Sequence, residues 1–183
     1  MLNRNSIELL PGHDNEPYFY DYPQTKMYRK IFGCQIKIKQ SGQLMHIITT
    51  HLESLPENDI ERTRQFMTLE KVIANLKTKN YIVAGDFSIY TPNERVDRYI
   101  NNAKIHDAWV EMGCPFKVKY TYNSKRNPNI EQNCQSRSDR ILYGNSHLLT
   151  PKVIKLLGRE NINDAKIPPS SHFGTFVSFN IKS

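Results

Sequence analysis

Five short segments of the sequence place polar side chains at the ends of apolar stretches that we expect to be strands. They carry carboxylates, imidazoles and hydroxyls, which are groups that can transfer protons or bind anions. Strand ends meet at one edge of a sheet, where layered α/β proteins usually keep their sites. The segments are residues 49–54 (TTHLES), 85–88 (GDFS), 107–109 (DAW), 137–140 (RSDR) and 170–174 (SSHFG).

Each segment alone also has an ordinary structural explanation. A Gly-Asp pair after a strand is more often a turn or a helix cap, and a single histidine is more often a surface or core group than a catalyst. Asp139 stands close to two arginines and is compatible with an ordinary ion pair. The ordered set of five segments, rather than any one of them, therefore indicates a site.

The strands that would carry these segments follow from the hydrophobic pattern. Residues 33–39 alternate apolar and polar, the pair Ser41-Gly42 makes a turn, and residues 44–50 are a second strand, which together predict a hairpin. The segment 11–24, rich in Asp, Asn, Pro and Tyr, predicts a loop. Further strands are expected at 6–10, 81–84, 118–122, 140–143, 153–157 and 175–181, and a short helix at 93–101.

A longer helix is expected over residues 58–79, where apolar side chains recur at helical spacing. Asn58 or Asp59 can cap its first turn, and Arg62 and Arg64 are expected on its polar side. A strand, a helix, a strand and then further strands indicate an α/β or α+β layered domain.

Composition limits the class of protein. The 183 residues, 38% of them hydrophobic and 23% charged, fit one domain over residues 1–183 and exclude coiled-coil, collagen-like and wholly disordered chains. The formal net charge of +7 favours a phosphate polymer or another anion as partner, although a merely basic soluble protein has the same charge.

The lack of a targeting pattern and the spacing of the cysteines predict an intracellular protein, in the nucleus or the cytoplasm. Three scattered cysteines fit a reducing compartment, and their spacing suggests no zinc site. The sequence has no signal-peptide pattern and no apolar run of the roughly 20 residues that a membrane helix needs, so no membrane partner is expected.

The order and spacing of the five segments resemble the motifs of the endonuclease/exonuclease/phosphatase family. The resemblance runs from about Leu2 to Ile181 and includes three further tripeptides, Thr25-Lys26-Met27, Tyr120-Thr121-Tyr122 and Leu156-Leu157-Gly158. It implies an α/β (α+β) layered sandwich, here a partial endonuclease/exonuclease/phosphatase fold that lacks the N-terminal portion.

The resemblance also implies a chemistry. Members of this family are divalent-metal phosphodiesterases in which water attacks phosphorus, here at a DNA 5′ end. Mg²⁺ or Mn²⁺ would neutralise charge on the phosphate, and the substrate would be DNA or another phosphodiester.

Four positions match the family's catalytic residues. His51 corresponds to a histidine that contacts phosphate, and Asp86 to the carboxylate that handles the attacking water. Asp139 corresponds to an aspartate that orients the last histidine, which is His172 here and stabilises the developing charge. A carboxylate suits this task because it fixes the tautomer of the imidazole and supports the imidazolium.

Four more positions match substrate-binding residues. Ser54 is a second donor near His51, and Tyr122 corresponds to an aromatic residue on the DNA-binding wall that acts by stacking. Ser88 and Ser171 stand where the family has Asn and Asp, which predicts poorer positioning of water and phosphate.

The family's main metal ligand, a Glu in its N-terminal part, has no counterpart among the residues before His51, so no metal ligand is assigned. Without that part, one apolar sheet face is expected to stay uncovered. The chain would then repack, associate with a chain that supplies the missing N-terminal half, or be a remnant. Three functions follow as alternatives: an active phosphodiesterase, a catalytically degenerate relative that binds nucleic acid or a partner, or the C-terminal half of a split enzyme.

Overall fold

The computed structural model describes residues 4–10, 17–91, 94–102, 105–162, 164 and 166–182. Its strands are β1 Ile7–Leu9, β2 Tyr18–Asp21, β3 Lys30–Ile38, β4 Leu44–His51, β5 Tyr81–Asp86, β6 His106–Asp107, β7 Tyr122–Asn123, β8 Gln135–Ser136, β9 Asp139–Tyr143, β10 Leu149–Leu157 and β11 Gly174–Ile181. Its helices are α1 Asp59–Ala74, α2 Arg95–Asn102 and α3 Ala108–Glu111, with single 3-10 turns at Pro56–Asn58 and Phe116–Val118.

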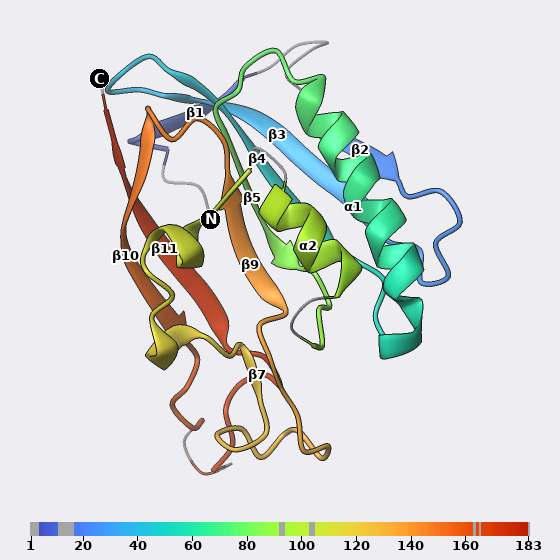
Figure 1. The fold of residues 1–183 in the computed structure, drawn as a ribbon. Coiled ribbons are helices and arrows are strands. Elements are labelled where there is room, and N and C mark those ends of the chain that lie inside the picture. The colour runs from blue at the N-terminus through green and yellow to red at the C-terminus, as the bar shows by residue number, and fades with distance from the viewer. Residues whose placement is uncertain are drawn as a thin grey trace.

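These elements form three layers (Figure 1). A mixed sheet in the order β1-β3-β4-β5-β9-β6, with β2 also paired to β3, lies in the middle. Helices α1 and α2 cover one face of this sheet, and the antiparallel pair β10–β11 packs on the opposite face. The layered α/β class predicted from the sequence is confirmed.

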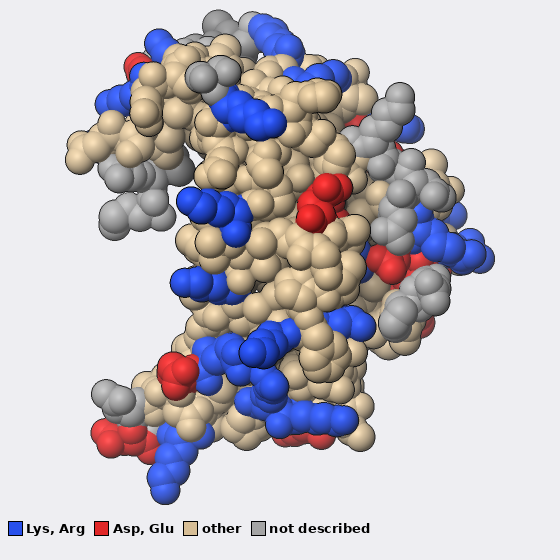
Figure 2. All heavy atoms as spheres, turned by 60° about the vertical axis from the view of Figure 1, so that its left-hand side comes forward, with Lys and Arg blue, Asp and Glu red and all other residues tan. Residues whose placement is uncertain are grey.

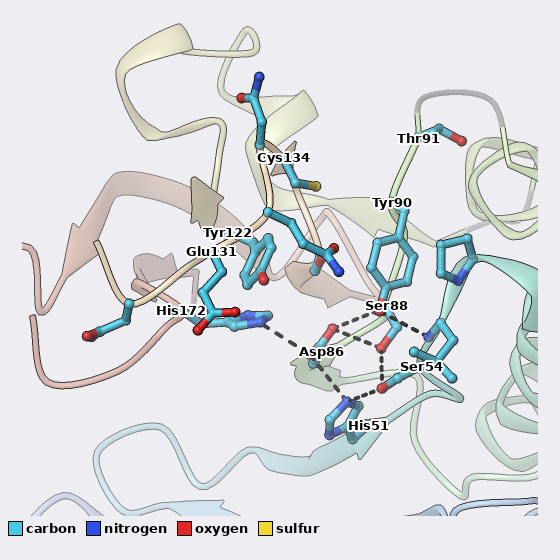
Figure 3. Close-up of a pocket in the computed structure, with 16 residues that line it drawn as sticks. His51, Ser54, Asp86, Ser88, Tyr90, Thr91, Tyr122, Glu131, Cys134 and His172 are labelled. Atoms are coloured by element: carbon cyan, nitrogen blue, oxygen red, sulfur yellow. Dashed lines mark hydrogen bonds and ion pairs between the residues drawn. The ribbon is translucent and has the colours of Figure 1, made fainter. Parts of the chain in front are cut away.

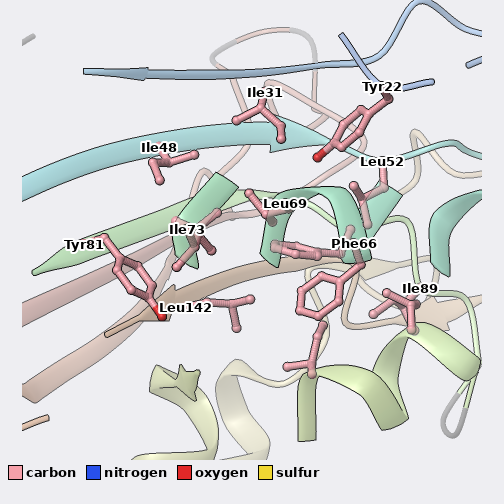
Figure 4. Close-up of a cluster of buried hydrophobic side chains, with 14 residues drawn as sticks. Tyr22, Ile31, Ile48, Leu52, Phe66, Leu69, Ile73, Tyr81, Ile89 and Leu142 are labelled. Carbon is pink, nitrogen blue, oxygen red and sulfur yellow. The ribbon is translucent and has the colours of Figure 1, made fainter. Parts of the chain in front are cut away.

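Strands β4 and β5 are parallel neighbours because α1 carries the chain back across the sheet between them. Apolar side chains of both strands pack under α1, among them Ile48 and Val83 against Phe66 and Leu69 (Figure 4). This buried cluster fixes the two strands side by side, and both end at the same edge of the sheet.

Helix α1 differs from its prediction at the cap and on one face. Asn58 precedes the helix without a side-chain capping bond; its amide instead donates to the carbonyl oxygen of Ser54 at 2.7 Å. The helix ends at Ala74, five residues before the predicted end. The placement of Arg62 on the polar side was wrong, because its side chain is fully buried and pairs with Glu94.

The predicted loop over residues 11–24 contains strand β2, while residues 11–16 lie outside the described part. Tyr18 of β2 pairs with Gly33 of β3, and a Cβ at that glycine would overlap the Tyr18 ring. The Tyr18 ring can therefore lie here because Gly33 has no side chain. A tyrosine-rich segment can form a strand when a neighbour supplies such a partner.

The strand predicted over residues 118–122 was wrong. The structure has a 3-10 turn that ends at Val118 and only the two-residue strand β7 from Tyr122. The Lys119 amide donates to the carbonyl oxygen of Phe116, so local turn bonds use the groups that a ladder would need. The predicted helix over 93–101 corresponds to α2, with residue 93 outside the described residues.

The second apolar face of the sheet is partly covered. Val177 and Phe179 of β11 pack against a buried cluster that includes Ile36 and Met45. On β10–β11 themselves, Leu157 and Phe176 are exposed on the outer face beside Lys155, whereas Ile181 lies on the inner side with Val177 and Phe179. The expected uncovered apolar face is therefore not seen on the central sheet, and the outer face of β10–β11 mixes apolar and charged residues.

In the described part of the chain, the structure shows no helix long and apolar enough to span a membrane.

Candidate active site

The register of three neighbouring strands builds the centre of the site. His51 at the end of β4 is the register partner of Asp86 at the end of β5, and Asp86 is the partner of Asp139 at the start of β9. Gly85 lets β4 and β5 approach here, because a Cβ at this position would overlap the carbonyl oxygen of Thr50. Three polar side chains therefore stand in a row along one edge of the sheet.

His172 reaches this row from the segment before β11. Its Nδ1 donates to Asp139 Oδ2 at 2.8 Å and lies 4.0 Å from Asp86 Oδ2. Asn127 is fully buried and its amide donates to the carbonyl oxygens of Ser170 and Ser171, which holds the segment in place. Because a carboxylate can only accept, Asp139 fixes the tautomer of His172 and leaves Nε2 free of that bond.

His51 has a cationic neighbour that the sequence did not identify. Arg29 Nη1 donates to His51 Nδ1 at 3.0 Å, and Arg29 Nη2 donates to Ser54 Oγ at 2.8 Å. Since arginine only donates, the proton of a neutral His51 is on Nε2, which lies 3.3 Å from Asp86 Oδ2. A guanidinium, an imidazole and a hydroxyl thus form one donor cluster beside Asp86.

A buried carboxylate places Arg29. Glu53, fully buried, accepts from Thr25 Oγ1 at 2.9 Å, from the Lys26 amide at 3.0 Å and from Gln65 Nε2 at 2.8 Å. Thr25 Oγ1 in turn accepts from the Arg29 amide at 2.9 Å. The Thr25-Lys26 pair that carried the family resemblance therefore anchors the segment that delivers Arg29.

Electrostatics push the two histidines in opposite directions. Burial lowers the pKa of His51; Asp86 opposes this effect and Arg29 adds to it. The hydrogen bond that His172 donates to Asp139 raises the pKa of His172, against the effect of burial. A histidine that is harder to protonate and one that is easier to protonate therefore lie on either side of Asp86.

Ser54 and Ser88 lie next to the row. Ser88 donates through its amide to Asp86 Oδ1 at 2.7 Å, and its hydroxyl lies 3.4 Å from Ser54 Oγ. The φ angle of Ser88 is +49°, a left-handed conformation that few residues other than Gly, Asn and Asp adopt without strain. The chain is therefore bent sharply at the residue that supports Asp86.

His51, Asp86 and His172 line one open cavity of about 810 Å³, together with Ser54 and Ser88 (Figure 3). Tyr122 lines its wall with its ring centroid 4.9 Å from that of His172, and Tyr90 lines the opposite side near Ser54. Six of the eight predicted site residues line the cavity, namely His51, Ser54, Asp86, Ser88, Tyr122 and His172. Asp139 does not line it but binds His172, and Ser171 does not line it and has its carbonyl bound by Asn127.

Asp86, Asp139 and His172 each offer a ligand atom, and these atoms lie within 4.8 Å of one another. Nδ1 of His172 is engaged by Asp139, so the carboxylate oxygens and Nε2 of His172 are the groups left for a cation. Magnesium is commonly held by one or two carboxylates together with water and substrate phosphate. The donor set therefore fits a divalent cation that prefers oxygen ligands.

The predicted segment 107–109 lies outside the large cavity. Asp107 accepts from the Trp109 amide at 3.0 Å and from Arg137 Nη1 at 2.7 Å, and neither Asp107 nor Trp109 lines the large cavity. Conversely, Arg29, Tyr90 and Asn127 belong to the site or its support, and no local sequence pattern pointed to them.

Three layers with a polar cavity at the strand ends define the class of this protein. A solved endonuclease/exonuclease/phosphatase protein from Bacteroides thetaiotaomicron superposes with a TM-score of 0.74 over 98% of this chain and 68% of the other, at 15% identity. No family model matches the chain.

Sequence relatives are more specific. Tyrosyl-DNA phosphodiesterase 2 from Xenopus laevis is 31% identical over 187 residues, which is 99% of this chain and 48% of the relative; for the human protein the values are 30% over 202 residues, 97% and 54%. A solved Danio rerio TDP2 complexed with single strand DNA product has a TM-score of 0.82 at 27% identity, covering 98% of this chain and 70% of that one.

This chain has the fold of the solved endonuclease/exonuclease/phosphatase protein, and its sequence resembles that of tyrosyl-DNA phosphodiesterase 2. It spans about half the length of the curated relatives that it matches.

Proposed function

We propose that this protein is a divalent-metal phosphodiesterase that hydrolyses a phosphodiester at a DNA 5′ end; its sequence relatives carry the name tyrosyl-DNA phosphodiesterase 2. The observation that carries the proposal is the row His51–Asp86–Asp139 with His172 bound to Asp139, of which His51, Asp86 and His172 line one cavity. The cavity has room for a water molecule and a phosphate, with the imidazoles of His51 and His172 on either side of them.

The roles follow from the contacts. Asp86, between the two imidazoles, accepts the proton of the attacking water, whose oxygen bonds to phosphorus as the bond to the leaving oxygen breaks. When it is protonated on both nitrogens, His172 offers its Nε2–H to the charge that builds on the phosphoryl oxygens, and Asp139 keeps that imidazole oriented. Arg29 adds fixed positive charge behind His51.

Asp86 and Asp139 are the residues that would hold the metal ion, and we take magnesium or manganese as its identity. When bound, the ion would neutralise charge on the phosphate and on the leaving oxygen.

The surface charge supports a DNA substrate. Figure 2 shows one face of the molecule on which Lys and Arg side chains are more frequent than Asp and Glu, in keeping with the net charge of +7. Positive charge of this kind attracts the phosphate backbone and makes binding sensitive to salt. Tyr122 adds an aromatic face on which a base can stack.

A partner chain is part of the proposal, because the outer face of β10–β11 leaves the large apolar side chains Leu157 and Phe176 exposed. The test is hydrolysis of an oligonucleotide with a 5′-tyrosyl group, with magnesium or manganese, both alone and mixed with the part of the Xenopus relative that this chain does not match. Tyrosine release in either arm that is lost in His172→Ala is expected. No release in both arms contradicts the proposed function.

The substitution Ser88→Asn is expected to raise the hydrolysis rate about tenfold, since single well-placed donors in such sites are worth about that or more. Asn is the residue that the family has at this position, its amide can donate to phosphate or water, and it tolerates the left-handed φ of +49° better than serine. The measurement is kcat with the 5′-tyrosyl oligonucleotide.

Ser41→Asn, in the exposed turn between β3 and β4, is the matched control and is expected to leave the rate unchanged. A folded Ser88→Asn variant with an equal or lower rate contradicts the assigned role of position 88.

A further inference from the structure

A second, smaller cavity of about 180 Å³ lies beside the large one, behind the segments that follow β5 and precede β9. The two cavities share Tyr90 and Thr91 in their linings. The smaller one also has a conspicuous lining of aromatic and cationic side chains, namely Trp109, Lys119, Tyr120, Arg137 and Arg140.

Arg140 lines this cavity, and two of its buried donors are unpaired. Its side chain is 3% exposed, and Nη2 contacts Asp97 Oδ1 at 2.6 Å. Nε and Nη1 have no hydrogen-bond acceptor among the described residues, although Nη1 lies 3.5 Å from Asp107 Oδ2. A buried donor without an acceptor is costly, and more so when it is charged. The charge of this guanidinium is therefore only partly compensated by the described residues around it.

The other cations are only partly neutralised. Arg137 shares Asp107 with Arg140 and stacks over Trp109, with its Cζ 4.5 Å from the ring centroid. Lys119 Nζ lies 5.0 Å from the centroid of Tyr120. Among the lining residues only Asp97 opposes the three cations, so the cavity is net positive.

We propose that this cavity is a second anion site that binds a phosphate group separate from the one that reacts. Guanidinium groups present paired N–H donors that match phosphate oxygens, and a lysine adds charge. The rings of Trp109 and Tyr120 give the site flat apolar walls suited to a nucleotide. The phosphate belongs either to the backbone of a DNA strand or to a free phosphate or nucleotide.

Trp109 is the single tryptophan of the chain and lies in this cavity but not in the large one, so its fluorescence reports on the second site. One arm titrates inorganic phosphate at constant ionic strength. The other arm titrates a single-stranded hexanucleotide without a 5′ group. A saturable change in the first arm identifies free phosphate as a ligand, and a change in the second identifies the strand backbone.

Three variants decide whether the signal comes from the proposed contacts. Lys119→Gln and Arg137→Gln are expected to weaken the apparent Kd at least about fivefold, the scale of one lost charge-assisted contact. Lys71→Gln, an equal loss of charge at an exposed position of α1, is expected to leave it unchanged. Lys119→Gln keeps the Arg137–Asp107 pair, so it remains informative if Arg137→Gln fails to fold.

The test needs no turnover, so it is independent of the proposed hydrolysis. In His172→Ala the fluorescence change is expected to persist, because His172 lines only the large cavity. The inference is overturned if neither arm gives a saturable change up to about 100 mM ligand, a range that covers millimolar affinity. It is equally overturned if Lys119→Gln and Lys71→Gln behave alike.

Discussion

Replacing Asp86 by Asn is expected to lower kcat for the 5′-tyrosyl oligonucleotide by about 10³-fold or more, the usual scale for losing a group that works as part of a catalytic unit. Asp86 Oδ2 lies 3.3 Å from His51 Nε2 and 4.0 Å from His172 Nδ1, so it is the one carboxylate between both imidazoles. An amide has nearly the same shape but has no charge and no basic oxygen to take the proton of water.

The KM is expected to change little, because the donors that hold the phosphate remain. Asp21→Asn is the control: Asp21 also ends a strand, β2, and pairs with Lys30 on the surface away from the cavity. A folded Asp86→Asn variant that keeps more than about a tenth of the rate would remove Asp86 from the role of base.

The order of the motifs along the chain identified most of the site residues. The rule that such residues follow the ends of strands explained only some of them. The prediction placed every polar segment after or at the end of a strand. His51 and Asp86 fit that rule, since β4 and β5 are parallel. Asp139 is instead the first residue of β9, and His172 comes two residues before β11. Asp139 reaches the row because β9 is antiparallel to β5. A sequence does not state strand direction, which is set by pairing.

The supporting residues could not be predicted because their partners are distant in sequence. Arg62 follows the helical spacing of a solvent-facing residue, and only the return of the chain after β5 brings Glu94 to it. Arg29 reaches His51 because the buried Glu53 draws residues 25 and 26 inward. Local periodicity carries no information about such contacts, which arise from packing between layers.

The substitution Glu94→Ala is expected to lower the free energy of unfolding by about 3–5 kcal/mol, the usual result of removing one partner from a buried ion pair. Arg62 has no exposed side-chain surface, and Glu94 Oε2 accepts from its Nη2 at 2.8 Å and its Nε at 3.2 Å. Without Glu94 the guanidinium keeps a full charge in the interior, with only backbone carbonyls as acceptors. Urea unfolding followed by circular dichroism measures the change.

The same substitution is expected to loosen one wall of the large cavity. Glu94 Oε1 accepts from the amides of Tyr90 and Thr91, both of which line the cavity, at 2.7 and 3.1 Å. Arg95→Ala is the matched control on the next residue: its contact to Asp59 spans 3.7 Å and its side chain is 60% exposed, so its loss should cost less than about 1 kcal/mol. If both variants lose similar stability, the buried pair is not what joins α1 to the segment after β5.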